Sequence, residues 1–158
     1  MAGMKQVRVS SAKHADATRG AAEYFLDFVQ RSPEAFQVGL RELHGGSKRM
    51  RAIFRRVVDD IALESVDQIT SLNLVPGLQA NALLPATKTI TYYMFYRALD
   101  AIDEPRARVR IADDIVAFIR AQFFGAIAQQ AAESKSEKRV TATGPDSLAN
   151  SAKRSGNG

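Results

Sequence analysis

The residues that could carry chemistry in this sequence form none of the sets that enzymes commonly use. The 158 residues include no cysteine and two histidines, His14 and His44, which excludes thiol nucleophiles, cysteine-based metal sites and multi-histidine metal centres. Glu42 and His44 lie two positions apart, so a helix would place them on different faces. We therefore expect no enzyme, no resident metal and no cofactor.

One cluster of cations stands out as a candidate binding site. It consists of Lys48, Arg49, Arg51, Arg55 and Arg56. On a helix, Lys48, Arg51 and Arg55 share one face, opposite the apolar side. Two interpretations stay open: a site for a phosphate or an acidic partner, and a solvated face whose aliphatic stems cover apolar neighbours. If a ligand carries phosphates, we expect these three cations to contact it.

The excess positive charge lies at the two ends of the sequence. The formal net charge is +5 at pH 7, yet residues 21–130 contain 13 basic and 13 acidic side chains. Residues 1–20 have a net charge of +3 and residues 131–158 a net charge of +2. Domains that bind nucleic acid usually carry their charge on a folded face. An alternative function is a small helical binding protein whose basic termini contact nucleic acid or an acidic partner.

The sequence contains no recognisable membrane-spanning segment or signal peptide. It contains no run of about 18 apolar residues, the length that a membrane-spanning helix needs. The first 20 residues lack the apolar core of a signal peptide. We therefore expect a cytoplasmic protein without a membrane partner.

The spacing of apolar residues predicts an all-α fold. Between the two ends, large apolar side chains recur every three or four positions, and no run alternates apolar and polar residues as a half-buried strand would. The pairs Ser32-Pro33 and Gly45-Gly46 are typical of breaks between helices. We expect a bundle of about five helices, at about 15–31, 33–44, 48–72, 79–100 and 105–131.

The chain divides into three parts by composition. We expect a flexible N-terminal segment at 1–14, a helical domain at 15–132 and a disordered basic tail at 133–158. The tail is rich in Ala, Ser, Lys, Gly and Asn. Because it has almost no large apolar side chains, it cannot offset the entropy lost on ordering.

The helix expected at 79–100 is apolar on all sides, which is typical of an enclosed helix. With only five helices, a second subunit is a natural way to supply the missing cover. The alternative is that this helix is the centre of a monomeric bundle. Its large side chains fall on three sides of a helical wheel: Leu83, Ile90 and Met94; Leu84 and Phe95; Tyr92, Tyr96 and Leu99.

Several short motifs carry a resemblance to a known family. They are the run YFLDFVQRSPEAF at 24–36, Leu40-Arg-Glu42, Gly45-Gly-Ser47, Phe54-Arg55, Ala98-Leu-Asp100, Ile115-Val116, Ile119-Arg120 and Gly125-Ala126. Together they resemble the C-terminal half of a TetR-family transcriptional repressor, in the branch that controls unsaturated fatty-acid synthesis. The resemblance covers roughly residues 20–130.

The resemblance implies an effector-sensing and dimerisation domain at 15–132, in a regulator that represses lipid or fatty-acid genes. The last two long helices, here 79–100 and 105–131, would form a four-helix bundle with those of a second copy. We therefore expect a homodimer. On this interpretation the dimer interface consists of Tyr96, Leu99, Val116, Ile119, Phe123 and Ile127.

The resemblance also implies an effector with a long acyl chain, as a thioester of coenzyme A or of acyl carrier protein. An apolar slot could hold the chain between the helices at 48–72 and 79–100. We expect its lining to be Phe54, Val58, Ile61, Leu84, Thr87, Thr91, Tyr92 and Phe95, with the threonines and the tyrosine offering polar atoms. The alternative is that all of these are ordinary core residues.

DNA contact in this family comes from an N-terminal helix-turn-helix. We find no such module before Ala15, so we expect DNA binding only through a module absent from this chain. A subunit that lacks the helix-turn-helix could still dimerise with a subunit that has one. Such a dimer would not bind its operator normally, because each subunit of the dimer contacts one of two DNA half-sites.

Overall fold

The structure is a computed structural model that describes residues 17–142, with side chains as far as residue 136 and His44 excepted. Within that part of the chain it is all-helical, as predicted. The segment at 1–14, expected to be flexible, and residues 143–158 of the basic tail lie outside the described residues.

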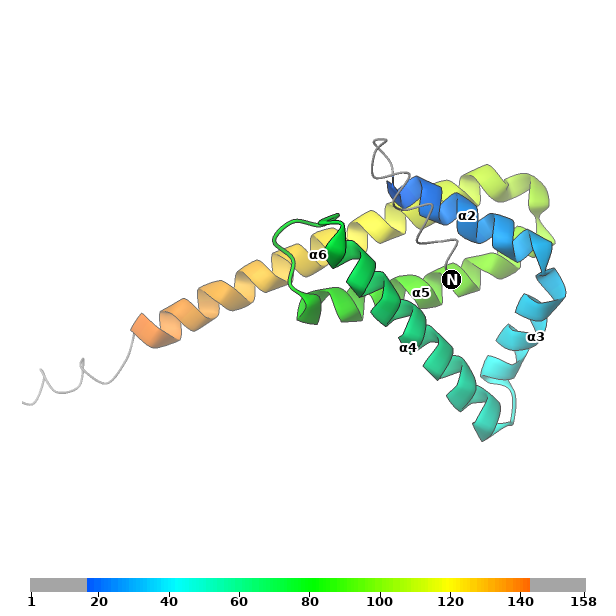
Figure 1. Cartoon of the computed structure of the whole chain (residues 1–158), viewed down its shortest axis with the longest axis horizontal. Helices are drawn as coiled ribbons and strands as arrows, with labels where there is room; N and C mark the ends of the chain where they lie inside the picture. The colour runs from blue at the N-terminus through cyan, green and yellow to red at the C-terminus, as the bar shows by residue number, and fades with distance from the viewer. Residues whose placement is uncertain (1–16, 143–158) are drawn as a thin grey trace, which may run out of the picture.

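Five α-helices form the described part of the chain, and a short 3₁₀-helix joins the last two (Figure 1). The helices follow the predicted order, and most of their ends agree within a few residues. They are α2 (Ala17–Arg31), α3 (Pro33–His44), α4 (Lys48–Ser71), α5 (Ala80–Asp103), η1 (Pro105–Ala107) and α6 (Arg108–Ala142).

Local chemistry explains where the helices end. The Ser47 hydroxyl caps α4 by accepting a hydrogen bond from the Met50 backbone N–H at 3.3 Å, because the first N–H groups of a helix have no partner within it. Between α4 and α5 the chain reverses through two residues with left-handed backbone angles. These are Asn73 (φ 47°) and Gly77 (φ 82°), residue types that adopt such angles at low cost.

The last helix extends further than the sequence predicted. α6 continues to Ala142, so the expectation of a disordered tail from 133 is wrong for 133–142. Alanine, glutamate and lysine have high helix propensity, and a helix that has already started can propagate without burying apolar side chains. Gln129 also donates a hydrogen bond to Glu133 at 3.0 Å. Figure 1 shows this end of α6 projecting beyond the other helices.

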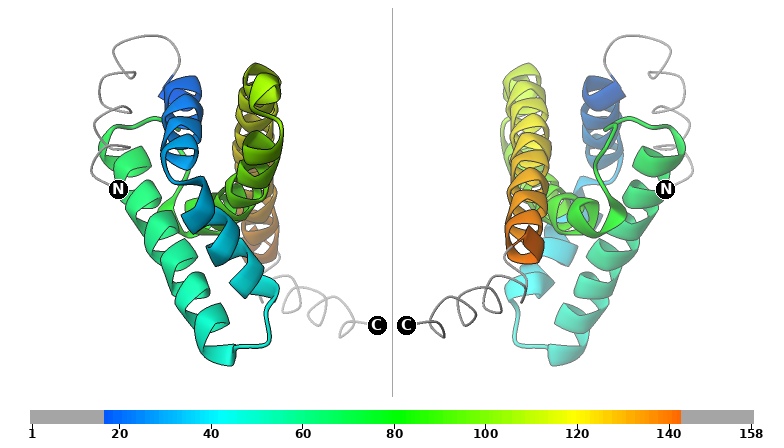
Figure 2. Two further views of the ribbon diagram at one scale, coloured as in Figure 1. Left: turned by 90° about the vertical axis from the view of Figure 1, so that its right-hand side faces the viewer. Right: turned by 90° about the vertical axis from the view of Figure 1, so that its left-hand side faces the viewer.

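The main hydrophobic core lies where α2, α5 and α6 meet. Leu26, Ile111 and Ile115 are fully buried there. A second, smaller core cluster joins the end of α4 to the start of α5 through Val66, Ile69 and Leu83. The views in Figure 2 place α4 on one side of the molecule, with α5 and α6 on the other. The fold is therefore a helical bundle with α5 at its centre.

Ion pairs attach α2 to α6 beside this core. Arg108 of α6 lies 2.7 Å from an Asp27 carboxylate oxygen (Nη2–Oδ1) and donates a hydrogen bond to Gln30. Arg19 donates to Glu23 in its own helix and to Asp113 of α6, and these hydrogen bonds raise the pKa of the Arg19 guanidinium above its ordinary value. The pairs are partly exposed to solvent, so each contributes little to stability and mainly orients the helices.

None of the helices in residues 17–142 is long and apolar enough to cross a lipid bilayer.

We predict that Leu26→Ala lowers the free energy of unfolding by about 2–5 kcal/mol, because it leaves a cavity between α2, α5 and α6. Urea denaturation followed by circular dichroism measures the change. The control is Val38→Ala on α3, where the side chain is 58% exposed and the expected change is within about 0.5 kcal/mol. Equal effects of the two substitutions would contradict the described core.

Candidate functional site

The structure brings most of the predicted slot residues together between α4 and α5. The rings of Phe54 and Phe95 meet edge to face, with centroids 5.3 Å apart. Val58 is fully buried beside them on α4. Ile61 and Leu84 are half-buried. The prediction that these two helices face each other through apolar residues is therefore confirmed.

Phenylalanines from four helices meet at one end of this contact. Phe36 of α3 packs against Phe25 of α2, with ring centroids 5.9 Å apart, and against Phe95 of α5, with centroids 5.7 Å apart. Phe28 of α2 approaches the same Phe36 at 5.7 Å. We call these four residues together with Phe54 the phenylalanine cluster. Sequence reasoning missed the cluster, because its members come from separate segments that no local spacing connects.

Buried polar side chains also concentrate on these two helices. Within the described residues, the buried polar side chains are Ser65 and Gln68 of α4 and Thr87 and Thr91 of α5. Gln68 donates a hydrogen bond to Glu64 at 3.2 Å. Buried polar atoms need such partners, because an unsatisfied one costs about 1–3 kcal/mol.

The two threonines use their hydroxyl groups within α5. Thr87 Oγ1 donates to the Leu83 carbonyl at 3.1 Å, and Thr91 Oγ1 donates to the Thr87 carbonyl at 2.8 Å. Each hydroxyl oxygen retains its capacity to accept a hydrogen bond. Tyr92, the third predicted polar residue, is 41% exposed. Its inclusion in the slot is wrong, because adjacent helical residues point about 100° apart and Thr91 is the one turned inward.

The cations of α4 have two different roles at the corner where α3 meets α4. Arg51 donates a hydrogen bond from Nη1 to the Gly45 carbonyl, which fastens the turn between the two helices. Lys48 and Arg55 are exposed, and neither forms an ion pair with another residue in the described part of the chain. Two of the three predicted phosphate contacts are therefore available to a ligand.

Half of the predicted dimer residues belong to the interior of the monomer. Val116 and Ile119 are buried in the core with α2 and α5, and Phe123 is half-buried against both core clusters. Assigning Val116 and Ile119 to a dimer interface is wrong, whereas Phe123 is partly covered. Their spacing identifies the most apolar side of α6, and that side is covered by helices of the same chain.

The other predicted interface residues lie closer to the surface. They are Tyr96, Leu99 and Ile127. Leu99 is half-buried, whereas Tyr96 is 65% exposed and Ile127 is also exposed. Two of the six predicted interface residues thus remain on the surface, and two more, Leu99 and Phe123, are partly covered.

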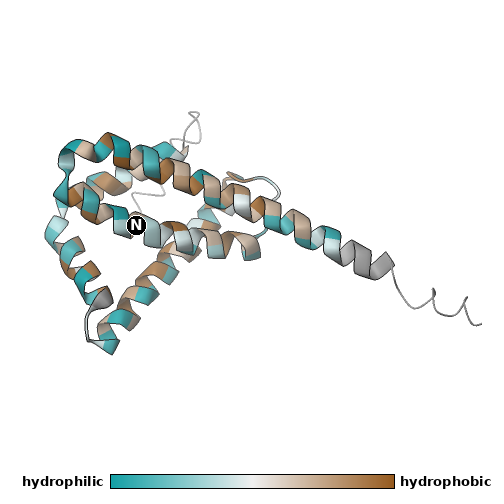
Figure 3. Ribbon diagram, turned by 180° about the vertical axis from the view of Figure 1, so that it is seen from behind, coloured by the Kyte–Doolittle hydropathy of each residue, from teal (hydrophilic) through white to brown (hydrophobic). Residues whose placement is uncertain are grey.

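The surface that lacks cover is formed by the outer sides of α5 and α6, which lie side by side (Figure 3). Among the described residues, the most exposed aromatic side chain is Phe124, at 71%. It was not among the predicted interface residues, because it lies away from the apolar side of α6 that carries Val116 and Ile119. Its neighbours along the helix are small. We define the α5–α6 face as Tyr92, Tyr96, Ala117, Ala121, Phe124, Gly125 and Ala128, all of which are exposed.

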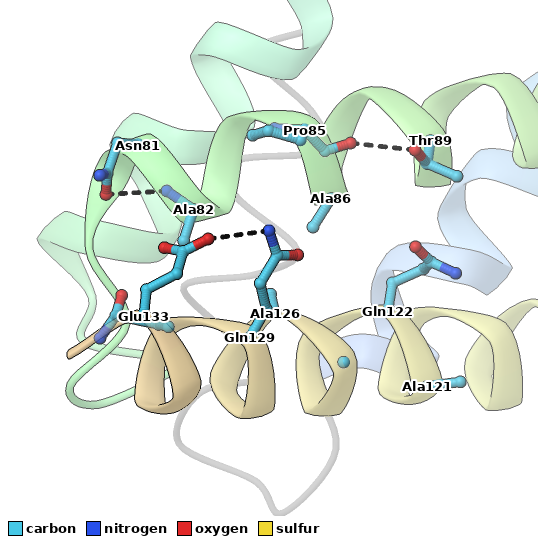
Figure 4. A pocket seen from close by; sticks show the side chains of 12 residues that line it. Asn81, Ala82, Pro85, Ala86, Thr89, Ala121, Gln122, Ala126, Gln129 and Glu133 are labelled. Carbon is cyan, nitrogen blue, oxygen red and sulfur yellow. Dashed lines mark hydrogen bonds between the residues drawn. The ribbon is translucent and has the colours of Figure 1, made fainter. Parts of the chain in front are cut away.

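A groove of about 410 Å³ runs between α5 and α6 beside this face. Figure 4 shows Ala86 pointing from α5 toward α6, with Gln122 rising from α6 next to it. The groove is lined by Asn81, Ala82, Pro85, Ala86, Thr89, Ala121, Gln122, Gly125, Ala126, Gln129, Gln130 and Glu133. Because a single carboxylate is its one ionisable group, the groove suits the packing of side chains better than acid–base chemistry.

An arginine and an aromatic stack hold α5 and α6 together next to the groove. Arg97 of α5 is 15% exposed and bridges Asp100 and Asp114, with 2.6 Å between its Nη2 and the Asp114 carboxylate. The rings of Tyr93 and Phe118 stack with centroids 3.9 Å apart. These contacts join α5 and α6 into one unit. Among the described residues, no three His, Asp or Glu side chains are grouped to hold a metal ion.

No protein-family model matches the chain, and no solved structure matches it. The TetR-family resemblance therefore stays a prediction that rests on the sequence motifs.

We predict that Thr91→Val changes the free energy of unfolding by less than about 1 kcal/mol, because the Thr87 carbonyl keeps its backbone hydrogen bond within α5. Thr91→Ala also removes a methyl group, which adds a cost of about 0.8 kcal/mol. Thermal and urea unfolding of both variants measure the difference. A loss above about 2 kcal/mol for Thr91→Val would contradict the described geometry.

Proposed function

We propose that this chain is the effector-sensing and dimerisation domain of a TetR-like transcriptional regulator. The observation that carries the proposal is the double role of α5. Its inner side meets α4 through Phe95 and buries Thr91, while its outer side presents Tyr92 and Tyr96 to solvent. One helix thus borders both the candidate effector slot and the candidate dimer face.

The α4–α5 contact has the chemistry expected of a site for a long acyl chain. Phe54 and Val58 supply apolar wall, and the buried hydroxyl group of Thr91 could orient a carbonyl group. The exposed Lys48 lies on the same helix as Phe54, at the end where the phosphates of a coenzyme A thioester or of acyl carrier protein would be neutralised. The acyl effector itself follows from the resemblance.

The α5–α6 face has the chemistry expected of a homodimer interface. Large exposed aromatic side chains such as Phe124 are unfavourable in water and are enriched at interfaces. Small residues beside them, such as Ala121 and Gly125, allow two helices to approach closely. A second copy related by a two-fold axis would complete a four-helix bundle from two α5–α6 pairs.

The proposed mechanism couples these two sites through α5. An effector that separates α4 from α5 would favour a conformation of the bundle in which α5 and α6 sit differently against the partner. DNA reading is assigned to a separate helix-turn-helix module, and repression of lipid or fatty-acid genes follows from the resemblance. No catalytic step is included in the proposal.

We predict that the protein binds oleoyl-CoA with one site per chain, measured by isothermal titration calorimetry on delipidated protein. Phe54→Ala should weaken binding about tenfold or more, because it removes one aromatic wall of the slot. Phe28→Ala is the matched control: Phe28 belongs to the phenylalanine cluster and contacts Phe36, but it lies on α2, outside the α4–α5 contact. Undetectable binding by the unaltered protein, or equal losses in both variants, would contradict the effector proposal.

We predict that the unaltered protein forms a dimer through the α5–α6 face and that Phe124→Glu raises its dissociation constant at least about a hundredfold, since a buried unpaired carboxylate costs several kcal/mol. Sedimentation velocity at several concentrations measures the shift in about 0.5 M salt, which screens contacts that rest on exposed ion pairs. The control is Val109→Glu, a substitution on the same helix at a position that is 70% exposed and outside the face. A dissociation constant that Phe124→Glu leaves unchanged would contradict the assignment of the dimer interface to the α5–α6 face.

A further inference from the structure

A second exposed surface, on the outer side of α4, has a regular pattern that the proposed function does not use. Six residues follow one another at spacings of four and three, as in a coiled-coil seam. Their side chains fall within an arc of about 80° on the helix. We call them the α4 seam: Arg49, Ile53, Arg56, Asp60, Leu63 and Asp67, all of them exposed.

The charges of α4 are divided between its two halves. Residues 48–56 contain five cations and no carboxylate, whereas residues 59–67 contain four carboxylates and no cation. This order opposes the helix dipole, which favours carboxylates near the N-terminus and cations near the C-terminus. The stability of the isolated helix therefore does not explain the pattern.

The charged seam residues have no ion-pair partner in the described part of the chain. Asp59, which lies off the seam, pairs with Lys88 of α5 at 2.7 Å. By contrast, Arg49, Arg56, Asp60 and Asp67 form no salt bridge with another described residue. The two apolar seam residues, Ile53 and Leu63, are 47% and 51% exposed.

The seam is complementary to itself when its direction is reversed. Counted from Val58, Arg49 and Asp67 are nine residues away on either side, Ile53 and Leu63 are five, and Arg56 and Asp60 are two. A second α4 running antiparallel across the seam, with a two-fold axis that crosses the outer side of α4 at the level of residue 58, would place each cation opposite a carboxylate and each apolar residue opposite another. In an antiparallel pair, the positive end of each helix dipole also lies beside the negative end of the other, which is favourable.

We propose that the α4 seam docks the α4 seam of a second copy of this chain, as an antiparallel helix pair about a two-fold axis. The contact pairs Arg49 with Asp67, Arg56 with Asp60 and Ile53 with Leu63 between the two copies, each pair occurring twice. This isologous contact is supported by charge complementarity and by the matched exposed apolar residues. It does not depend on an effector or on DNA.

The seam is separate from the α5–α6 face, because α4 lies on the opposite side of the molecule from α6 (Figure 2). One chain could therefore use both surfaces at once. Two different two-fold contacts on each chain would build assemblies larger than a dimer. The two surfaces can be tested independently for the same reason.

A charge-swap experiment tests the seam in a Phe124→Glu background, where the α5–α6 contact is removed. This parent, the Phe124→Glu chain, should sediment as a dimer through the seam in about 50 mM salt and as a monomer in about 0.5 M salt, because salt screens exposed ion pairs. Arg49→Asp with Arg56→Asp, or Asp60→Arg with Asp67→Arg, should each raise the dissociation constant about tenfold or more, because every attractive pair becomes repulsive. An equimolar mixture of the two double variants should recover the dimer, now as a heterodimer resolved by native mass spectrometry.

The matched control reverses two cations outside the seam, Lys48→Asp with Arg55→Asp, and should leave the dimer intact. Circular dichroism checks that each variant keeps its helix content. A monomeric parent at about 100 μM, double variants that still self-associate, or a mixture that stays monomeric would overturn the proposal. The α5–α6 face is tested at high salt by comparing the unaltered chain with the Phe124→Glu chain, so failure at the seam leaves that assignment standing.

Discussion

The constraint on which the structure depends is the burial of α5. Each of the other α-helices in the described part of the chain, as well as η1, packs against it. Its sequence is apolar on all sides, so no single neighbour can cover it, and the surrounding helices must approach from different directions. Leu83, Ile90, Met94 and Ala98 are buried along almost its whole length. The hydrophobic effect therefore sets the arrangement, with α5 as the axis of the bundle.

Ion pairs adjust how neighbouring helices sit against each other, but the arrangement of the helices is set by hydrophobic burial. The pairs Arg108–Asp27 and Lys88–Asp59 join neighbouring helices but lie largely in solvent, where such pairs contribute little. Arg97 differs because it is mostly buried and bridges two carboxylates between α5 and α6. A buried cation without those partners would be costly, so the bridge fixes how these two helices sit against each other.

The positions of the helices were predictable from the amino-acid sequence, whereas the sides of the helices that become covered were less so. Helix positions were correct because they depend on local spacing and on breaks such as Ser32-Pro33. Val116 and Ile119 were misassigned to a dimer interface, because apolar spacing identifies the side that is buried but not the chain that covers it. The continuation of α6 through 133–142 was missed, because low apolar content was taken as disorder although the segment has high helix propensity.

The candidate slot was partly predicted for the same physical reason. Phe54 and Phe95 could be matched from their positions on facing helices, whereas the contribution of Phe36 depends on how α3 folds back against α2 and α5. Tyr92 was assigned to the wrong side of α5, because a helix that is apolar all round gives no pattern by which to choose a face.

The amino-acid order by itself determined the all-helical class, the number of helices, their approximate ends and the reversed charge halves of α4, because each is a property of residues within a few positions of one another. Only the tertiary structure decided which sides are covered. It buried Val116, left Phe124 and the α4 seam exposed, and gathered five phenylalanines from four helices. Covering a surface depends on the packing of distant segments, and helical periodicity carries no information about which segment arrives there.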